Sequence, residues 1–209
     1  MEITKSDIVS KIRTAIDDIL SVSDSFSTDT DNELWQATWH AVESLQESLP
    51  LDMLTPKADA TYYANGQHQT TNTDGSGYLS LENDFVRFVS LSLLSWNGRI
   101  VTELLEPGSD EALRQTNKWS RGTVSKPRAM LDHDASGNKI LRYWSAGKSN
   151  DQYNHSVAIM NYIPKATMTG TTITSALRDI AERQVVYQAA AIFFEGKKES
   201  VLADKFRNL

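Results

Sequence analysis

The stretch FVRFVSLSLLSWNGRIVTELL, residues 85–105, decides the fold class because it predicts a β-hairpin. Within residues 89–93, apolar side chains alternate with serines, the period of two that a half-buried strand requires. Asn97-Gly98 is a strong turn signal, because both central residues of a type I′ turn need positive φ. A helix stays an open alternative, since a period of 3.6 also fits Phe85, Phe88, Val89 and Leu93. A lone hairpin is marginal in water, so other strands or helices must cover it.

Length and composition bound the remaining possibilities. The 209 residues allow one large domain or two small ones, and 40% hydrophobic and 23% charged residues fit an ordinary globular fold. A net charge of −6 and a pI near 5.2 give no global basic field for nucleic acid or membrane. The absence of cysteine excludes disulfides, thiolate metal sites and cysteine nucleophiles. No apolar run is long enough to cross a bilayer, and the N-terminus lacks a signal-peptide core.

Helical patterns occupy both ends of the chain. Residues 6–20 have an apolar stripe, and a second helix begins at a capping box of Thr30 and Glu33 and ends at Pro50. The last 45 residues again predict helix: a stripe from Ile173 to Val185 that continues to Gly196, then a short final helix over residues 200–207. The expected strands between these ends are residues 61–63, 78–81, 127–131, 139–144 and 157–163, with a short helix capped by Ser109 and a hairpin loop at 134–138.

This order predicts an α+β fold: a helical bundle formed by the N- and C-terminal helices, with an inserted β-rich hairpin region. The expected bundle comprises residues 1–57 and 165–209, and the β-rich insertion comprises residues 58–164.

Motifs for catalysis, cofactors and metals are absent from the sequence. It contains no phosphate-binding glycine loop, nucleophile elbow or paired-histidine spacing, so we expect no catalytic residue, no cofactor and no metal. Asp132-His133-Asp134 resembles a metal cluster, but neighbouring residues on a strand face opposite ways, which favours a solvated hairpin end. Asp84 could act as a general acid, although a local turn role is favoured.

Aromatic and basic residues suggest contact surfaces. The stretch KWSRGTVSKPR, residues 118–128, has four positive charges and no acid. It is either a solvated loop or a surface for an acidic partner or a phosphate backbone. For Trp96, Trp119 and Trp144, burial in the core or at a subunit interface is favoured over stacking on sugars or bases.

Several of these pieces together resemble a known family. They are the two-helix start, the polar loop Asp74-Gly-Ser-Gly77, the stretch Leu81-Glu-Asn-Asp-Phe-Val-Arg87, Trp96, Lys118-Trp-Ser-Arg-Gly122 with Lys126-Pro127, and the Ala-rich helix from Ala176 to Phe194. The pattern resembles the head–tail connector, or adaptor ring, proteins of tailed bacteriophages, most of all those of crAss-like phages. The stretch from Leu81 is similar to their Leu-Pro-x-Asp-Phe-Leu-Arg phrase, with Glu82 where that phrase has proline.

The resemblance implies a structural virion protein at the head–tail junction, synthesised in the host cytoplasm. Such a protein docks under the portal protein, contacts an adjacent ring or tail protein, and forms a homo-dodecameric ring around double-stranded DNA without binding it specifically. An acidic wall would repel DNA, because phosphate affinity comes from positive charge. The resemblance also implies a docking tail over residues 196–209 with Phe206 as its apolar anchor. The interface candidates are then Lys118, Trp119, Arg121, Lys126, Arg128, Trp96 and Phe206.

The alternative is an aromatic-rich module that binds a glycan or nucleic acid through the tryptophans and the basic stretch. A hydrolase using Asp84 or the Asp132–Asp134 cluster is a more distant third.

Overall fold

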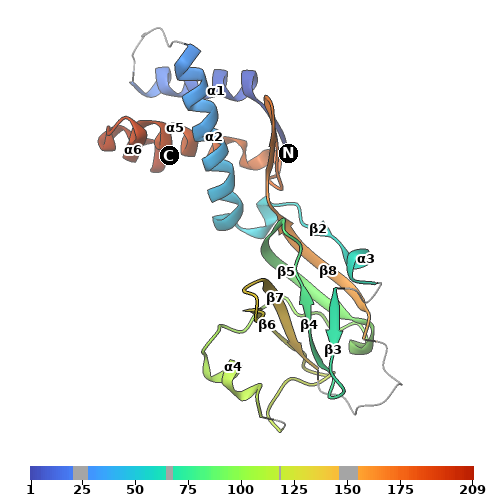
Figure 1. Cartoon of the computed structure of the whole chain (residues 1–209). Helices are drawn as coiled ribbons and strands as arrows, with labels where there is room; N and C mark the ends of the chain where they lie inside the picture. The colour runs from blue at the N-terminus through green and yellow to red at the C-terminus, as the bar shows by residue number, and fades with distance from the viewer. Residues whose placement is uncertain (21–27, 65–67, 118, 146–154) are drawn as a thin grey trace. The chain divides into compact units, whose positions relative to one another are not determined.

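The computed structural model describes residues 1–20, 28–64, 68–117, 119–145 and 155–209. Within them the chain forms two compact units, Met1–Thr55 with Ile163–Leu209, and Pro56–Tyr162. We call these the terminal unit and the central unit. Figure 1 shows the elements of both, coloured along the chain.

Helices and a small antiparallel sheet build the terminal unit. β10 (Thr172–Thr174) is the middle strand of this sheet, between β1 (Glu2–Thr4) and β9 (Thr167–Thr169). Helix α5 contacts the other three α-helices that the structure describes in this unit. The helices are α1 (Lys5–Leu20), α2 (Thr28–Ser48), α5 (Glu182–Gly196) and α6 (Ser200–Arg207), with 3-10 turns η1 (Leu51–Met53) and η3 (Asp179–Ala181).

The expected fold class is wrong. The protein is mixed α/β, with about 41% helix and 29% strand in three antiparallel sheets, and its helices are scattered and do not form a bundle of the two termini. Helix α3 (Ala60–Ala64) lies where a strand was expected, whereas α4 (Asp110–Arg114) lies where the sequence predicted a short helix. In Figure 1, α2 crosses α1 and α5, whereas bundle helices run within about 20° of one another.

The error arises from the period assigned to the start of the C-terminal helix. Residues 167–174 read TMTGTTIT, and threonine favours strands because its branched Cβ restricts χ1. They form the hairpin of β9 and β10, which turns at Gly170 with φ 60. Ile173 is fully buried opposite Ile3 in the sheet, so its place in an apolar stripe reflects strand burial.

Two antiparallel sheets and their shared core build the central unit. In the first, β8 (Val157–Pro164) lies between β2 (Lys57–Ala58) and β5 (Phe85–Leu93). The second has the order β3 (Gln69–Thr71), β4 (Ser76–Ser80), β7 (Lys139–Trp144), β6 (Arg128–His133). Side chains of both sheets meet in one apolar cluster that includes Leu79, Phe85, Leu91, Trp96, Tyr143 and Tyr162.

The stretch from Phe85 to Leu105 is a strand followed by a tight turn. The predicted strand is confirmed as β5, and the turn residues Asn97 and Gly98 have φ values of 50 and 79. The returning arm pairs with β5 only at Leu91 and Val101, through two hydrogen bonds of 2.9 Å. Before the turn, the chain forms the 3-10 turn η2 (Leu94–Trp96). The main partner of β5 is therefore β8, which lies far away in the sequence.

Local turn and cap chemistry was predicted more accurately. The hairpin of β6 and β7 is confirmed, with its loop closed by Asp134 N donating to Asn138 O at 2.9 Å. The cap of α4 is confirmed, because Ser109 Oγ accepts from Ala112 N at 3.2 Å. The strand expected at residues 61–63 is wrong, since these residues form helix α3.

Candidate functional site

Charged side chains gather around Lys57 in the central unit. We call this group the Lys57 cluster: Lys57, Asp59, Glu82, Asp84 and Tyr162. Lys57 lies on β2 opposite Tyr162 of β8, and the two acids at 82 and 84 come from the turn that enters β5. That turn is fixed by Phe85 N donating to Glu82 O at 3.0 Å.

The Lys57 ammonium contacts all three carboxylates of the cluster. Its Nζ lies 3.0 Å from an oxygen of Asp59, 3.0 Å from one of Glu82, and 3.3 Å from one of Asp84. The Tyr162 hydroxyl donates to the second oxygen of Asp84 at 2.8 Å. The Asp59 and Glu82 side chains are 16% and 18% exposed, so water screens these contacts only in part.

The electrostatics keep Lys57 charged. Burial alone would lower the pKa of Lys57, but hydrogen bonds with Tyr162 and the carboxylates outweigh burial and raise that pKa. A permanently protonated amine serves neither as a nucleophile nor as a general base. Burial and the neighbouring Asp59 raise the pKa of Glu82, whereas the hydrogen bond with Glu82 lowers the pKa of Asp59. Glu82 is therefore the first of the two to take a proton as the pH falls.

The Lys57 cluster has a structural role, which we call the Lys57 brace: one ammonium group holds three carboxylates from two segments of the chain together. The cation that three carboxylates would otherwise attract is already supplied by Lys57. Among the described residues, no group of three or more histidine, aspartate or glutamate side chains is placed to hold a metal ion. The Lys57 cluster therefore joins β2 to the turn before β5, in the same stretch, Leu81 to Arg87, that carries the resemblance to connector proteins.

A second site presents Trp119. We call residues 109–122 the Trp119 turn; position 118 in it, the predicted interface residue Lys118, lies outside the described residues. The Trp119 side chain is 89% exposed and that of Leu113 is 61% exposed. At the base of the turn, the buried Gln115 accepts from Gly122 N at 2.7 Å.

The remaining basic candidates are partly neutralised by acids. Arg121 forms an ion pair with Asp74, from the turn between β3 and β4. Burial acts to raise the pKa of Asp74, but hydrogen bonds from Ser76 and the Arg121 guanidinium lower it to about 2. Arg128 lies 4.0 Å from Glu111, and Lys126 is exposed. Residues 118–128 contain no acid of their own, but two of their arginines pair with acidic residues from other segments.

Two predicted interface residues belong to the cores of their units. Trp96 is fully buried, and its ring packs edge-on against Tyr143 with centroids 6.2 Å apart. Phe206 is 1% exposed and stacks on Phe194, because α6 folds back on α5. Both side chains are buried in this fold, so the structure does not place either of them on the surface, and their assignment as contact residues stays a prediction. Trp144, at 9% exposure, is also buried.

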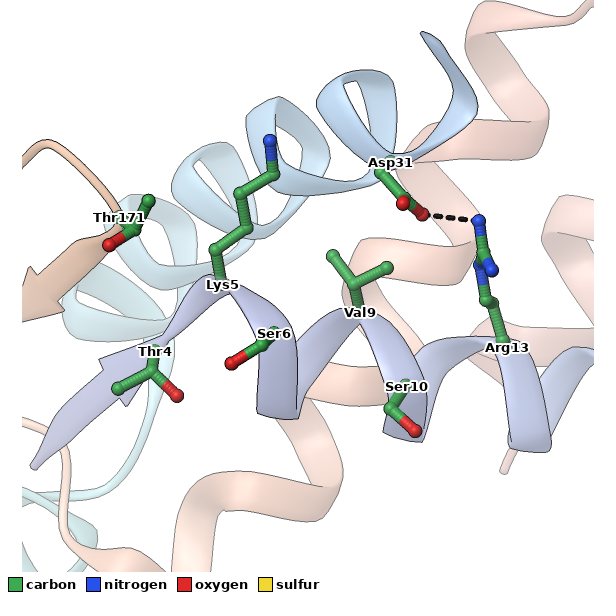
Figure 2. A pocket seen from close by; sticks show the side chains of 8 residues that line it. All are labelled: Thr4, Lys5, Ser6, Val9, Ser10, Arg13, Asp31 and Thr171. Carbon is green, nitrogen blue, oxygen red and sulfur yellow. Dashed lines mark hydrogen bonds and ion pairs between the residues drawn. The ribbon is translucent and has the colours of Figure 1, made fainter. Parts of the chain in front are cut away.

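The terminal unit has a groove of about 510 Å³ along the start of α1. Figure 2 shows Arg13 directed at Asp31 of α2, with which it forms an ion pair, and Val9 between it and Lys5. Lys5 donates to Asn32, so both cations of the groove already bind side chains of α2. The groove thus lies where α1 meets α2, and its two cations, Lys5 and Arg13, are paired with side chains of α2.

The Lys57 cluster was not predicted from the sequence, whereas the role of the charges at residues 132–134 was. The alternating pairs Lys57-x-Asp59 and Glu82-x-Asp84 were the available signal, but nothing local indicates that they meet. Asp132 pairs with Arg142 at 3.0 Å, and Asp134 accepts from its own loop at Ser136 and Asn138. The structure therefore bears out the interpretation of residues 132–134 as a hairpin end.

No protein-family model matches the sequence, and no curated protein matches it significantly. Within the part of the chain that the structure describes, no helix combines the length and apolar character needed to cross a bilayer.

Proposed function

We propose that this protein is a structural subunit of a virion, a ring-forming connector at the head–tail junction of a tailed bacteriophage. In this role it docks under the portal protein, contacts the next ring or tail protein, and continues the channel for double-stranded DNA. It works by contact between chains and carries no catalytic step. The resemblance of residues 81–87 and 118–127 to connector proteins motivates the proposal.

The observation that carries the proposal is the exposure of Trp119. Aromatic side chains dominate the energetics of protein interfaces, and a tryptophan with 89% of its surface in water gains most from being covered. Its backbone N donates to Asn117 Oδ1 at 2.9 Å, so the turn fixes the main chain from which the indole projects. A pre-positioned anchor of this kind suits a protein whose task is association.

The charge distribution supports the same role. Residues 56–162 contain eleven lysine and arginine and eleven aspartate and glutamate residues, so the net charge of −6 belongs to the terminal unit. A ring repeats this negative charge in every copy. If the terminal unit borders the channel, the wall repels DNA phosphates and leaves the genome free to slide.

The alternative function, a glycan- or nucleic-acid-binding module, is favoured by the same tryptophan and by the exposure of Arg114 and Lys126, which lie near it in the sequence. Stacking on bases or sugars uses exposed aromatics in the same way. The two functions differ in what covers the indole ring.

Co-expression with the portal protein of the same genome tests the proposal. A tag on the portal is expected to retain this chain in stoichiometric amount after washing. The proposal fails if the chain elutes in the wash and also shows no association with the tail proteins of that genome.

A further inference from the structure

The outer face of the four-stranded sheet in the central unit has a trough of about 310 Å³. Along β7, Leu141 and Tyr143 point into the apolar core, so Arg142 between them projects from the opposite face. Tyr78 of β4 lies directly across from Arg142 in the register of the sheet, and therefore on the same face. We call this site the Tyr78 trough, and its volume lies at the lower end of the range of small-ligand sites. Its lining includes Asn72, Tyr78, Asp134, Ile140, Arg142 and Trp144.

Both ends of the strands contribute to the lining of the trough. Trp144, at the end of β7, lies next to the turn between β3 and β4, which supplies Asn72. Ile140, near the start of β7, follows the loop that supplies Asp134. The side chains of Ile140 and Trp144 are buried, whereas Arg142 between them is exposed. From Ile140 to Trp144 the strand runs about 13 Å, so the trough is elongated along β7.

Several polar groups of the trough have unused hydrogen-bonding capacity. Among the described residues, the Tyr78 hydroxyl has no hydrogen-bond partner, and Arg142 uses only its Nε, which lies 3.0 Å from a carboxylate oxygen of Asp132. Asn72 donates its amide nitrogen to Ser76 Oγ at 3.0 Å, and its amide oxygen accepts from no described residue. The trough thus offers donors at Arg142, an acceptor at Asn72, and a hydroxyl at Tyr78 that serves as either.

The charges of the trough are balanced. Arg142 faces Asp132, and Asp134 accepts from Ser136 N and Asn138 N, so neither lining charge stands alone. An anionic ligand would meet the two carboxylates, and a cationic ligand would meet the guanidinium, which disfavours both. An apolar ligand would cover the free hydroxyl and N–H groups without replacing their bonds to water, which costs free energy. The ligand class that remains is neutral and rich in hydroxyl groups.

The two kinds of surface in the trough match those of a neutral sugar. Sugar hydroxyls both donate and accept hydrogen bonds, and the C–H face of a sugar ring packs against an aromatic ring. We propose that the Tyr78 trough binds a short segment of a neutral glycan, with Tyr78 packed against a sugar ring and Arg142 and Asn72 hydrogen-bonded to sugar hydroxyls. Because strands hold Tyr78 and Arg142 on a rigid scaffold, binding requires little ordering.

This inference goes beyond the connector role and does not depend on it. The trough includes no residue of the Trp119 turn, so the two sites are tested separately.

Nuclear magnetic resonance titration of the full ¹⁵N-labelled chain tests this site. The probes are neutral tetrasaccharides of glucose, mannose, galactose and N-acetylglucosamine, each added separately. The anionic probes are a sulfated heparin disaccharide and a single-stranded thymidine oligonucleotide. At least one neutral tetrasaccharide is expected to shift the backbone amide signals of residues 72–78 and 134–144, with an affinity that does not change when salt is added.

Variants of the lining separate the contributions of the ring and of the hydrogen bonds. Tyr78→Ala is expected to weaken binding about 10-fold, and Tyr78→Phe, which keeps the ring, is expected to weaken it less. Arg142→Met keeps the aliphatic stem, removes the donors and should also weaken binding. Lys139→Met, on the same strand but outside the lining, is the matched control and should bind as wild type does. The amide spectrum of each variant without ligand checks that the fold is retained.

The inference is overturned if none of the neutral tetrasaccharides shifts the amides of the trough. Equal affinities of Tyr78→Ala and Lys139→Met for a bound tetrasaccharide would overturn it as well. Salt-sensitive binding of the heparin disaccharide or the oligonucleotide in place of the neutral sugars would assign the trough to an anionic ligand and refute the neutral class. Each of these results leaves the connector role standing, because that role is tested by binding to the portal protein.

Discussion

At the scale of single residues, Lys57 pairs with three carboxylates of the central unit. Replacing it in Lys57→Met leaves three carboxylates without their cation. We expect the free energy of unfolding at pH 7 to fall by about 1–3 kcal/mol, less than for a fully buried pair because Lys57 is 37% exposed. Urea unfolding monitored by tryptophan fluorescence measures this change.

Lys139→Met is the matched control for that variant, since Lys139 is an exposed lysine of the same unit. It should change stability by less than about 0.5 kcal/mol. The loss in Lys57→Met should also shrink near pH 4, where Glu82, whose pKa is raised, takes up a proton and part of the repulsion disappears. Equal losses of unfolding free energy in Lys57→Met and Lys139→Met would refute the stabilising role of the Lys57 brace.

Asp74 gives a prediction about pH. Its pKa in the fold is about 2, below its ordinary value of 3.8, so its contribution to stability is complete above about pH 4 and is lost as the pH falls toward 2. Asp74→Asn keeps an acceptor for Ser76 and removes the charge facing Arg121. The variant should lose about 1 kcal/mol at pH 7, a value reduced because the side chain is 41% exposed. Unfolding curves at pH 7 and pH 2.5 should converge in acid; a constant difference would contradict this account.

At the scale of elements, Gly122 fixes the base of the Trp119 turn. A Cβ there would lie 2.5 Å from Trp144 O and 3.0 Å from Arg128 N, backbone atoms that cannot move aside cheaply. Gly122→Ala should therefore destabilise the central unit by about 1–3 kcal/mol. It should also increase amide exchange over residues 109–122, measured by hydrogen–deuterium exchange. Gly196→Ala, where nothing lies within 4 Å, should leave exchange in this turn unchanged.

The elements differ in how well they could be predicted from the sequence. The α4 cap, the loop between β6 and β7, and the turn at Asn97 were predictable, because each is set by side chains within a few residues. The hairpin at residues 167–174 was assigned to helix, since a short apolar stripe does not distinguish a buried strand from a helix. The Lys57 cluster could not be predicted, because 25 residues separate Lys57 from Glu82 and only the fold brings them together.

At the scale of the whole molecule, exposure could not be predicted either. The five tryptophans look alike in the sequence, yet Trp96 is fully buried and Trp119 is 89% exposed. The difference depends on which parts of the fold cover each ring. Exposure separates a core tryptophan from one that is able to contact a partner. The proposal of assembly therefore rests on the exposure of Trp119 and on the connector-like motif in the sequence.

The mass of the assembled particle tests the central claim most directly. Mass photometry and electron microscopy of the chain bound to its portal protein should show one closed ring of many copies, with a copy number fixed across preparations. The Trp119→Ala variant should yield fewer rings at the same concentration. A chain that stays monomeric at every concentration, with and without the portal, would contradict the claim that this protein works by contact with its own copies.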